Sequence, residues 1–145
     1  MTEGVLPTAK SSRRVDEREK LQKIVARRGL CGLANDTKWD EFIGALRART
    51  EWRPSYRYRG IDGPISGWDV EWFHHLPFPM LSVEWLDIAH RQEVREHRLP
   101  PRITVIDHSE WIVPLLEKVG LDYRVGKEMI RVFGYSPRSS ELFDL

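Results

Sequence analysis

The strongest constraint on the fold is a stripe of large apolar residues at helical spacing. Four of them recur at i, i+3, i+4 and i+7, on one face of an α-helix: Trp39, Phe42, Ile43 and Leu46. Asp36 or Thr37 is expected to cap the first turn of this helix. A helix face of this kind must be buried against another layer, so the stripe predicts a sheet packed over it.

Alternating patterns elsewhere in the chain predict β-strands. Residues 52–59 alternate strictly between aromatic or proline positions and arginine or serine positions. Residues 81–88 and 102–106 are rich in β-branched and aromatic side chains, which favour strands. Residues 121–125 and 128–135 flank a glycine and predict a hairpin.

Two further helices complete the order of elements. Residues 15–28 and 107–119 carry apolar side chains on one face, and each is followed by a glycine that can end a helix. Pro114 is expected either to delay the start of the second helix or to kink it. Because the order lacks βαβ alternation, we expect an α+β fold, with a mainly antiparallel sheet of about four to six strands, two or three covering helices and a terminal hairpin. One domain at residues 14–145 is expected to follow a flexible tail at residues 1–13.

Length and composition are those of an ordinary folded protein. The 145 residues suit one domain, and 41% hydrophobic with 31% charged residues is far from the composition of disordered chains. No apolar run approaches the ~20 residues that span a bilayer, and the N-terminus lacks the apolar stretch of a secretory signal, so we expect a cytoplasmic protein without a membrane role. The single cysteine, Cys31, excludes an intramolecular disulfide and is expected to be a small residue of the core.

The segment Ser66–Pro79 holds the densest group of side chains suited to chemistry. Two acids and two histidines in it are of the types that bind metals or transfer protons: Asp69, Glu71, His74 and His75. Glu84 or Asp87 from a neighbouring strand could share a pocket with the two acids. The spacing matches no metal motif, so no metal or cofactor is expected. The structural alternative is that the acids accept hydrogen bonds from tryptophan N–H groups or pair with arginines such as Arg57.

Six tryptophans are many for a chain of this length. Trp39 and Trp111 fall on helix faces that are expected to be buried. The others fall in or beside predicted strands: Trp52, Trp68, Trp72 and Trp85. A strand tryptophan that is exposed would anchor a protein interface, where Trp, Tyr and Arg dominate the binding energy.

Arginines and tyrosines alternate along residues 52–59. The arginine side could clamp single-stranded nucleic acid, although a solvated strand face is the simpler interpretation. Together with the acid and histidine cluster, these positions are the candidate partner-binding residues: Arg53, Tyr56, Arg57, Tyr58, Arg59, Trp68, Asp69, Glu71, Trp72, His74 and His75.

Charge is distributed unevenly, although the net charge is only +1. Residues 1–30 carry eight Lys or Arg against four acids, and the rest of the chain carries fifteen against eighteen. The basic stretch at residues 10–28 could contact nucleic acid, but its acids and bases are interleaved as on a solvated helix face.

Four motifs together resemble one protein family. They are TKWDEF at Thr37–Phe42, GPISGWDVEWF at Gly63–Phe73, VEWLDI at Val83–Ile88 and IRVFGY at Ile130–Tyr135. Over about residues 36–136 the chain is similar to a bacterial domain-of-unknown-function family, number 6678. The resemblance implies a small bacterial cytoplasmic protein, and it supplies no activity or catalytic residues.

Three functions are consistent with these observations. We expect a protein-binding protein that neutralises or regulates its partner, in the manner of an immunity protein that inhibits a secreted bacterial toxin. The first alternative is an enzyme of unrecognised type that uses the cluster at residues 69–75. The second is nucleic-acid binding through residues 10–28 and the Arg53–Arg59 strand. The chain lacks phosphate-binding, dinucleotide-binding, nucleophile-elbow and zinc-protease motifs, which removes the commonest enzyme classes.

Overall fold

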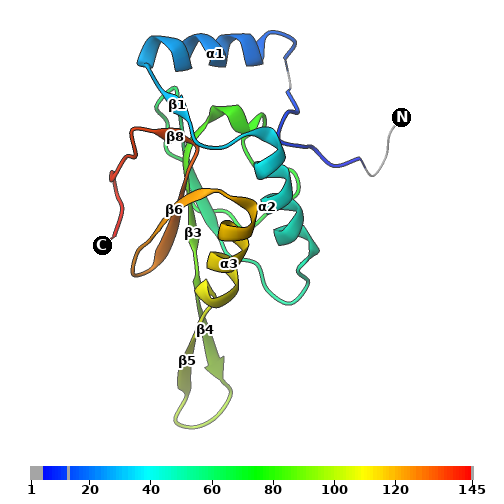
Figure 1. Cartoon of the computed structure of the whole chain (residues 1–145). Coiled ribbons are helices and arrows are strands. Elements are labelled where there is room, and N and C mark those ends of the chain that lie inside the picture. Colours follow the sequence, from blue (N-terminus) through cyan, green and yellow to red (C-terminus); the bar gives the residue numbers. More distant parts are fainter. Residues whose placement is uncertain (1–4, 13, 145) are drawn as a thin grey trace.

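Four antiparallel strands form the central sheet, in the order β2-β3-β7-β6. The computed structural model of the chain describes residues 5–12 and 14–144 (Figure 1). The strands of this sheet are β2 (Tyr56–Gly60), β3 (Val83–Ala89), β6 (Asp122–Val125) and β7 (Met129–Phe133). β6 and β7 form the predicted hairpin, and the α+β class with a mainly antiparallel sheet is confirmed.

The register of the strands gives the sheet two chemically different faces. Tyr58, Leu86 and Val132 lie side by side on the face that belongs to the hydrophobic core. The adjacent row of cross-strand neighbours points to the opposite, outer face and is charged: Arg57, Asp87, Arg131 and Arg124. Side chains alternate along a strand, so the pattern of residues 52–59 correctly separated tyrosines from arginines.

Helices α2 (Asp36–Ala48) and α3 (Ser109–Val119) cover the apolar face of the sheet. Their inward side chains are buried: Trp39, Phe42, Ile43, Leu46, Ile112 and Leu116. Each such side chain contributes roughly 1.5–3 kcal/mol by removing apolar surface from water. The predicted stripe of α2 is therefore a core face.

The starts of both helices differ slightly from the predicted positions. Asn35, the residue before the two predicted caps, caps α2, because its Oδ1 accepts a hydrogen bond from the Lys38 N–H at 2.8 Å. α3 begins at Ser109, two residues later than predicted, and contains Pro114. The proline lacks an N–H, so one backbone hydrogen bond of α3 is missing.

Helix α1 (Glu17–Arg28) lies across one end of the sheet (Figure 1). It ends at Gly29, whose φ of 66° is a left-handed conformation that glycine adopts without strain. Leu21 packs with Tyr135 beside a one-turn 3-10 helix, η1 (Met80–Ser82). Among the helices of the described residues, none is long and apolar enough to cross a membrane.

A two-stranded ribbon pairs β1 (Cys31–Gly32) with β8 (Tyr135–Ser136). Cys31 is exposed on this ribbon, so the expectation that it is a core residue is wrong. Cys31 stays exposed because β1 lies outside the four-stranded sheet that the helices cover.

Residues 5–12, part of the segment that was expected to be a flexible tail, pack against the body. Ala9 is fully buried. Its N–H donates to Asp40 Oδ1 at 2.7 Å, and its carbonyl oxygen accepts from the Met80 N–H at 2.8 Å. Residues 1–4 and 13 of the expected tail lie outside the described residues.

A hairpin arm projects from the body at the end opposite to α1 (Figure 1). It consists of β4 (Arg91–Glu96) and β5 (Arg102–Asp107), which pair with each other in an antiparallel two-stranded sheet. All six residues of β5 are exposed. The strand predicted at residues 102–106 is confirmed, whereas β4 occupies a charged stretch for which the sequence pattern indicated no element.

Candidate functional site

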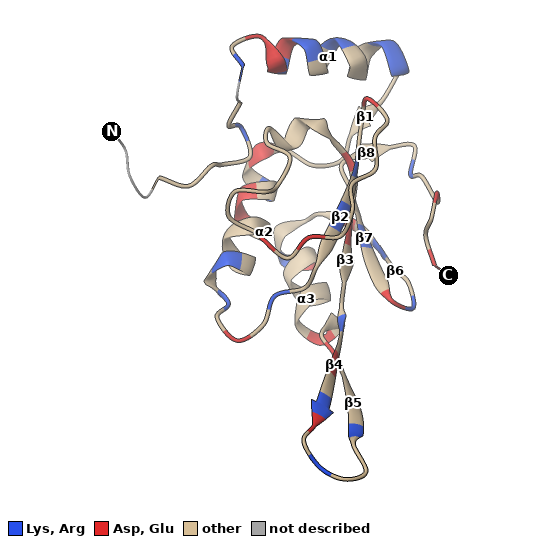
Figure 2. Ribbon diagram, turned by 180° about the vertical axis from the view of Figure 1, so that it is seen from behind, with Lys and Arg blue, Asp and Glu red and all other residues tan. Residues whose placement is uncertain are grey.

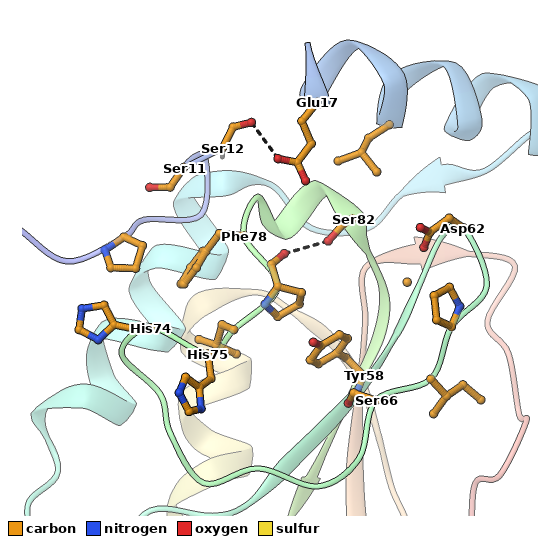
Figure 3. A pocket seen from close by; sticks show the side chains of 17 residues that line it. Ser11, Ser12, Glu17, Tyr58, Asp62, Ser66, His74, His75, Phe78 and Ser82 are labelled. Carbon is orange, nitrogen blue, oxygen red and sulfur yellow. Dashed lines mark hydrogen bonds between the residues drawn. The ribbon is translucent and has the colours of Figure 1, made fainter. Parts of the chain in front are cut away.

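A cavity of about 680 Å³ lies between two stretches of the chain that follow β2, residues 60–66 and 74–78, and the segment that leads into α1 (Figure 3). Its walls are apolar where Leu21, Leu76 and Phe78 contribute. Polar groups enter from several elements: Glu17, Tyr58, Asp62, Ser66, His74 and His75. In the view of Figure 3, the two histidines lie on one side and Asp62 on the other. Part of the cluster predicted in Ser66–Pro79 therefore lines a cavity.

Asp69 and His75 form a hydrogen-bonded pair beside this cavity. Asp69 Oδ2 lies 2.9 Å from His75 Nδ1. The other oxygen of Asp69 accepts the Glu71 N–H at 2.9 Å, and this backbone donor is the main reason that the pKa of Asp69 is lowered. Asp69 is thus held as a carboxylate that orients the imidazole of His75, as in many acid–base sites.

Glu71 closes the turn that carries the histidines. Its Oε1 accepts hydrogen bonds from the N–H groups of Phe73, His74 and His75, at 2.6, 2.7 and 3.1 Å. Burial acts to raise the pKa of Glu71, but these backbone donors outweigh it and lower the pKa to about 2. Glu71 therefore stays ionised at neutral pH and cannot act as a proton donor there.

The wider acid cluster considered from the sequence does not form. Glu84 pairs with Arg28 of α1 at 2.6 Å, and Asp87 is fully buried on the outer face of the sheet. Neither lines the cavity, so the alternative in which they share a pocket with Asp69 and Glu71 does not hold, because arginines bind both carboxylates instead. Within the described ranges, no three His, Cys, Asp or Glu side chains are placed to hold a metal ion.

Several candidate partner-binding residues have structural roles. Tyr56 and Trp72 are fully buried, and their polar groups donate to the Glu71 and Pro54 carbonyl oxygens at 2.6 and 2.8 Å. Arg53 donates to two carbonyl oxygens at the end of α2. Tyr56 and Trp72 cannot contact a partner in the folded protein, because the core encloses them.

Other candidates are accessible, but they lie on different surfaces. His74 and His75 are exposed at the cavity, and Tyr58 is half-buried in its wall. Trp68 is 46% exposed, and the Arg57 guanidinium lies 4.8 Å from its ring on the outer face. Of the four tryptophans in or beside the predicted strands, Trp68 has the most exposed side chain.

The outer face is held together by a buried ion-pair cluster. Arg131 Nε and Nη2 donate to the two carboxylate oxygens of Asp87 at 2.7 and 3.0 Å, and the Arg57 Nε donates to the same carboxylate at 2.9 Å. The Arg131 guanidinium stacks 3.7 Å from the ring centroid of Trp85. Arg131 was not among the sequence candidates. The sequence feature that could have identified it is its position as the single charged residue within the apolar strand MIRVF.

The β4–β5 arm is the second surface that the sequence did not single out. Its exposed aliphatic residues are Leu99, Ile103, Val105 and Ile106. The side chain of Leu99, in the loop between the strands, is 95% exposed, and that of Ile103 is 60% exposed. Figure 2 shows charged segments along β4 and an uncharged stretch along β5.

The comparisons with known proteins agree with the motifs. The model of a family of unknown function, DUF6678, matches residues 21–139. The match confirms the resemblance seen in the four motifs and extends it to include part of α1. No curated protein and no solved structure matches the chain.

Proposed function

We propose that this chain, which belongs to DUF6678, a family of unknown function, binds a protein partner through the β4–β5 arm. The main support for this proposal is the shape and surface of the arm, a projecting hairpin with exposed aliphatic residues on β5 and in its loop. An isolated two-stranded hairpin is only marginally stable in water, and contact with another protein would bury its apolar side chains.

The two edges of the arm differ in a way that favours β5 for docking. β4 carries charges at alternate positions, Arg91, Glu93 and Arg95, which discourage pairing with another strand. The centre of β5, residues 103–106, is uncharged. In the described chain β5 pairs with β4 alone, so the backbone groups on its other edge face away from any strand. An extended segment of a partner can add to this edge, which is a common mode of peptide recognition.

The charges of the arm also bear on the type of partner. Residues 91–107 contain four arginines and three acids, which nearly cancel. Binding would therefore depend on apolar burial and backbone pairing more than on net charge. A bacterial toxin that is not a strongly basic nuclease fits this surface, and the protein would then act in the cytoplasm as an immunity-type inhibitor or regulator.

The test is affinity purification of the tagged protein from its native cytoplasm, comparing three versions of the chain. Val105→Lys places a charge in the centre of β5. Val15→Lys is the matched control, since Val15 is fully exposed just before α1, at the end of the molecule opposite to the arm. We expect the wild type and Val15→Lys to retain one stoichiometric protein that Val105→Lys loses. Equal recovery by all three versions, or no stoichiometric partner, would refute binding through the arm.

The Asp69–His75 pair supports a second candidate function, acid–base catalysis at the cavity. A carboxylate that orients a histidine is the arrangement that general bases use, and His75 is exposed at the cavity wall. Hydrolysis of ester and phosphoester substrates by the purified wild type, with loss in Asp69→Asn and His75→Ala at unchanged melting temperature, is expected for this function. Wild-type protein without hydrolysis, or variants with full activity, would count against it.

A further inference from the structure

The outer face of the central sheet carries more positive charge than its own acids balance. Arg57, Arg131 and Arg124 lie in one cross-strand row with a single acid, Asp87. Arg59 lies on the same face, one alternation further along β2. We call these four arginines, together with Trp85, the arginine face. Asp87 already pairs with both Arg57 and Arg131, so the face retains donors for a further anionic or carbonyl-rich group.

Residues 139–144 of the same chain occupy this face, and they do so as a bound peptide would. The Arg131 Nη1 and the Arg57 Nη2 donate to the carbonyl oxygens of Ser139 and Leu142, each at 3.0 Å. Such backbone contacts hold any extended segment, irrespective of its sequence. Arg131 is fully buried, and its guanidinium contacts the backbone of this segment.

Two side chains of the segment supply specificity. The carboxylate of Glu141 pairs with the Arg59 guanidinium. The ring of Phe143 lies 5.3 Å from the Arg131 guanidinium and 5.4 Å from that of Arg124. The face thus recognises an acid two residues before an aromatic ring.

The segment has no regular secondary structure of its own after β8, so contacts with the sheet hold its shape. Leu142 has a φ of 58°, a left-handed conformation that costs a non-glycine residue roughly 1–2 kcal/mol. Asp144 approaches the β6–β7 turn so closely that a Cβ on Gly126 would lie 2.3 Å from its backbone oxygen. Asp144 Oδ2 also accepts the Glu128 N–H at 2.7 Å.

We propose that the arginine face is a binding site for an acidic peptide segment of the pattern Glu-x-Phe-Asp on a partner protein, and that residues 139–144 occupy it in cis. The site is separate from the β4–β5 arm and does not depend on the function proposed for the arm. An intramolecular segment acts at an effective concentration on the order of millimolar, so a partner segment binds appreciably only when it displaces residues 139–144.

The experiment uses the full chain and a fluorescent synthetic peptide of residues 137–144, with binding measured by fluorescence anisotropy. The variant Glu141→Lys with Phe143→Ala weakens the cis occupant without altering the arginine face. We expect it to bind the peptide at least about tenfold more tightly than the wild type does, a difference of about 1.4 kcal/mol. A peptide carrying the same two substitutions is the control and should not bind.

Two further variants guard against a trivial result. Gly126→Ala places a Cβ where Asp144 lies, so it hinders the cis segment and the peptide alike, and when added to the Glu141→Lys, Phe143→Ala variant it should weaken peptide binding. Arg59→Glu, combined with Phe143→Ala, leaves Glu141 of the cis segment facing a like charge and should prefer a peptide with Lys in place of Glu141. A folded Glu141→Lys, Phe143→Ala variant that does not bind the peptide, wild type that binds as tightly as that variant, or equal binding of the control peptide would each overturn the proposal.

Discussion

The buried pair of Asp87 and Arg131 gives the sharpest prediction about stability. Both side chains are 0% exposed, and the carboxylate accepts three hydrogen bonds from Arg131 and Arg57. In Asp87→Asn, an amide of the same size removes the negative charge and leaves the Arg131 charge buried without compensation. Breaking a buried ion pair on one side costs about 3–5 kcal/mol, and we expect the free energy of unfolding to fall by that amount.

Urea unfolding followed by tryptophan fluorescence measures this loss, with an unchanged m-value showing that the fold is retained. Glu141→Gln is the control, because it removes an exposed ion pair with Arg59 and should cost less than about 1 kcal/mol. Replacing Asp87 and Arg131 together, as in Asp87→Leu with Arg131→Met, should recover much of the loss, since no fully buried charge then remains and only the Arg57 guanidinium, which is 15% exposed, loses its partner. A loss below about 1 kcal/mol in Asp87→Asn, or a double variant as unstable as the single one, would refute this reasoning.

Three further predictions concern the core, a helix cap and pH. Phe42→Ala should lower the free energy of unfolding by about 3–5 kcal/mol in urea titrations, because the ring is fully buried against the sheet; a loss near zero would contradict that packing. Asn35→Ala should cost about 1 kcal/mol through loss of the α2 cap, and a neutral result would mean that the cap contributes nothing. Burial, followed by the nearby Arg49 guanidinium, lowers the pKa of His108, whose Nδ1 accepts the Trp111 indole N–H at 2.8 Å. The unfolded state therefore takes up the proton first, so the melting temperature should fall as pH drops below about 6.5, and less steeply in His108→Gln; parallel pH profiles would exclude this coupling.

Local periodicity in the sequence was sufficient to predict the helices and strands that make up the core. The stripe of Trp39, Phe42, Ile43 and Leu46 is buried as predicted, because helical spacing by itself decides which side chains share a face. The alternation of residues 52–59 likewise separated Tyr58 from Arg57 across the sheet. Helix boundaries were less certain. The Asn35 side chain accepts the Lys38 N–H and the Asp107 side chain accepts the Ser109 N–H, and other polar residues next to a helix start can make such hydrogen bonds equally well.

The candidate cluster at residues 69–75 was found from residue types, but its roles were not. Sequence spacing placed two acids and two histidines together. The structure showed that Glu71 binds the backbone of its own turn, whereas Asp69 orients His75. Glu84 or Asp87 could have joined this cluster because they fall on a neighbouring strand, but arginines from other elements bind them instead.

The sequence by itself determined the class of fold, the faces of its helices and strands, and the membership of DUF6678, since these depend on periodicity and on short motifs. Only the tertiary structure decided which faces are covered. Nothing local distinguishes β5, which stays exposed, from β7, which is fully buried. Nor does anything local place Glu141 on Arg59, which is 82 residues earlier in the chain. Burial depends on which distant segments arrive at a face, and that is a property of the packed chain as a whole.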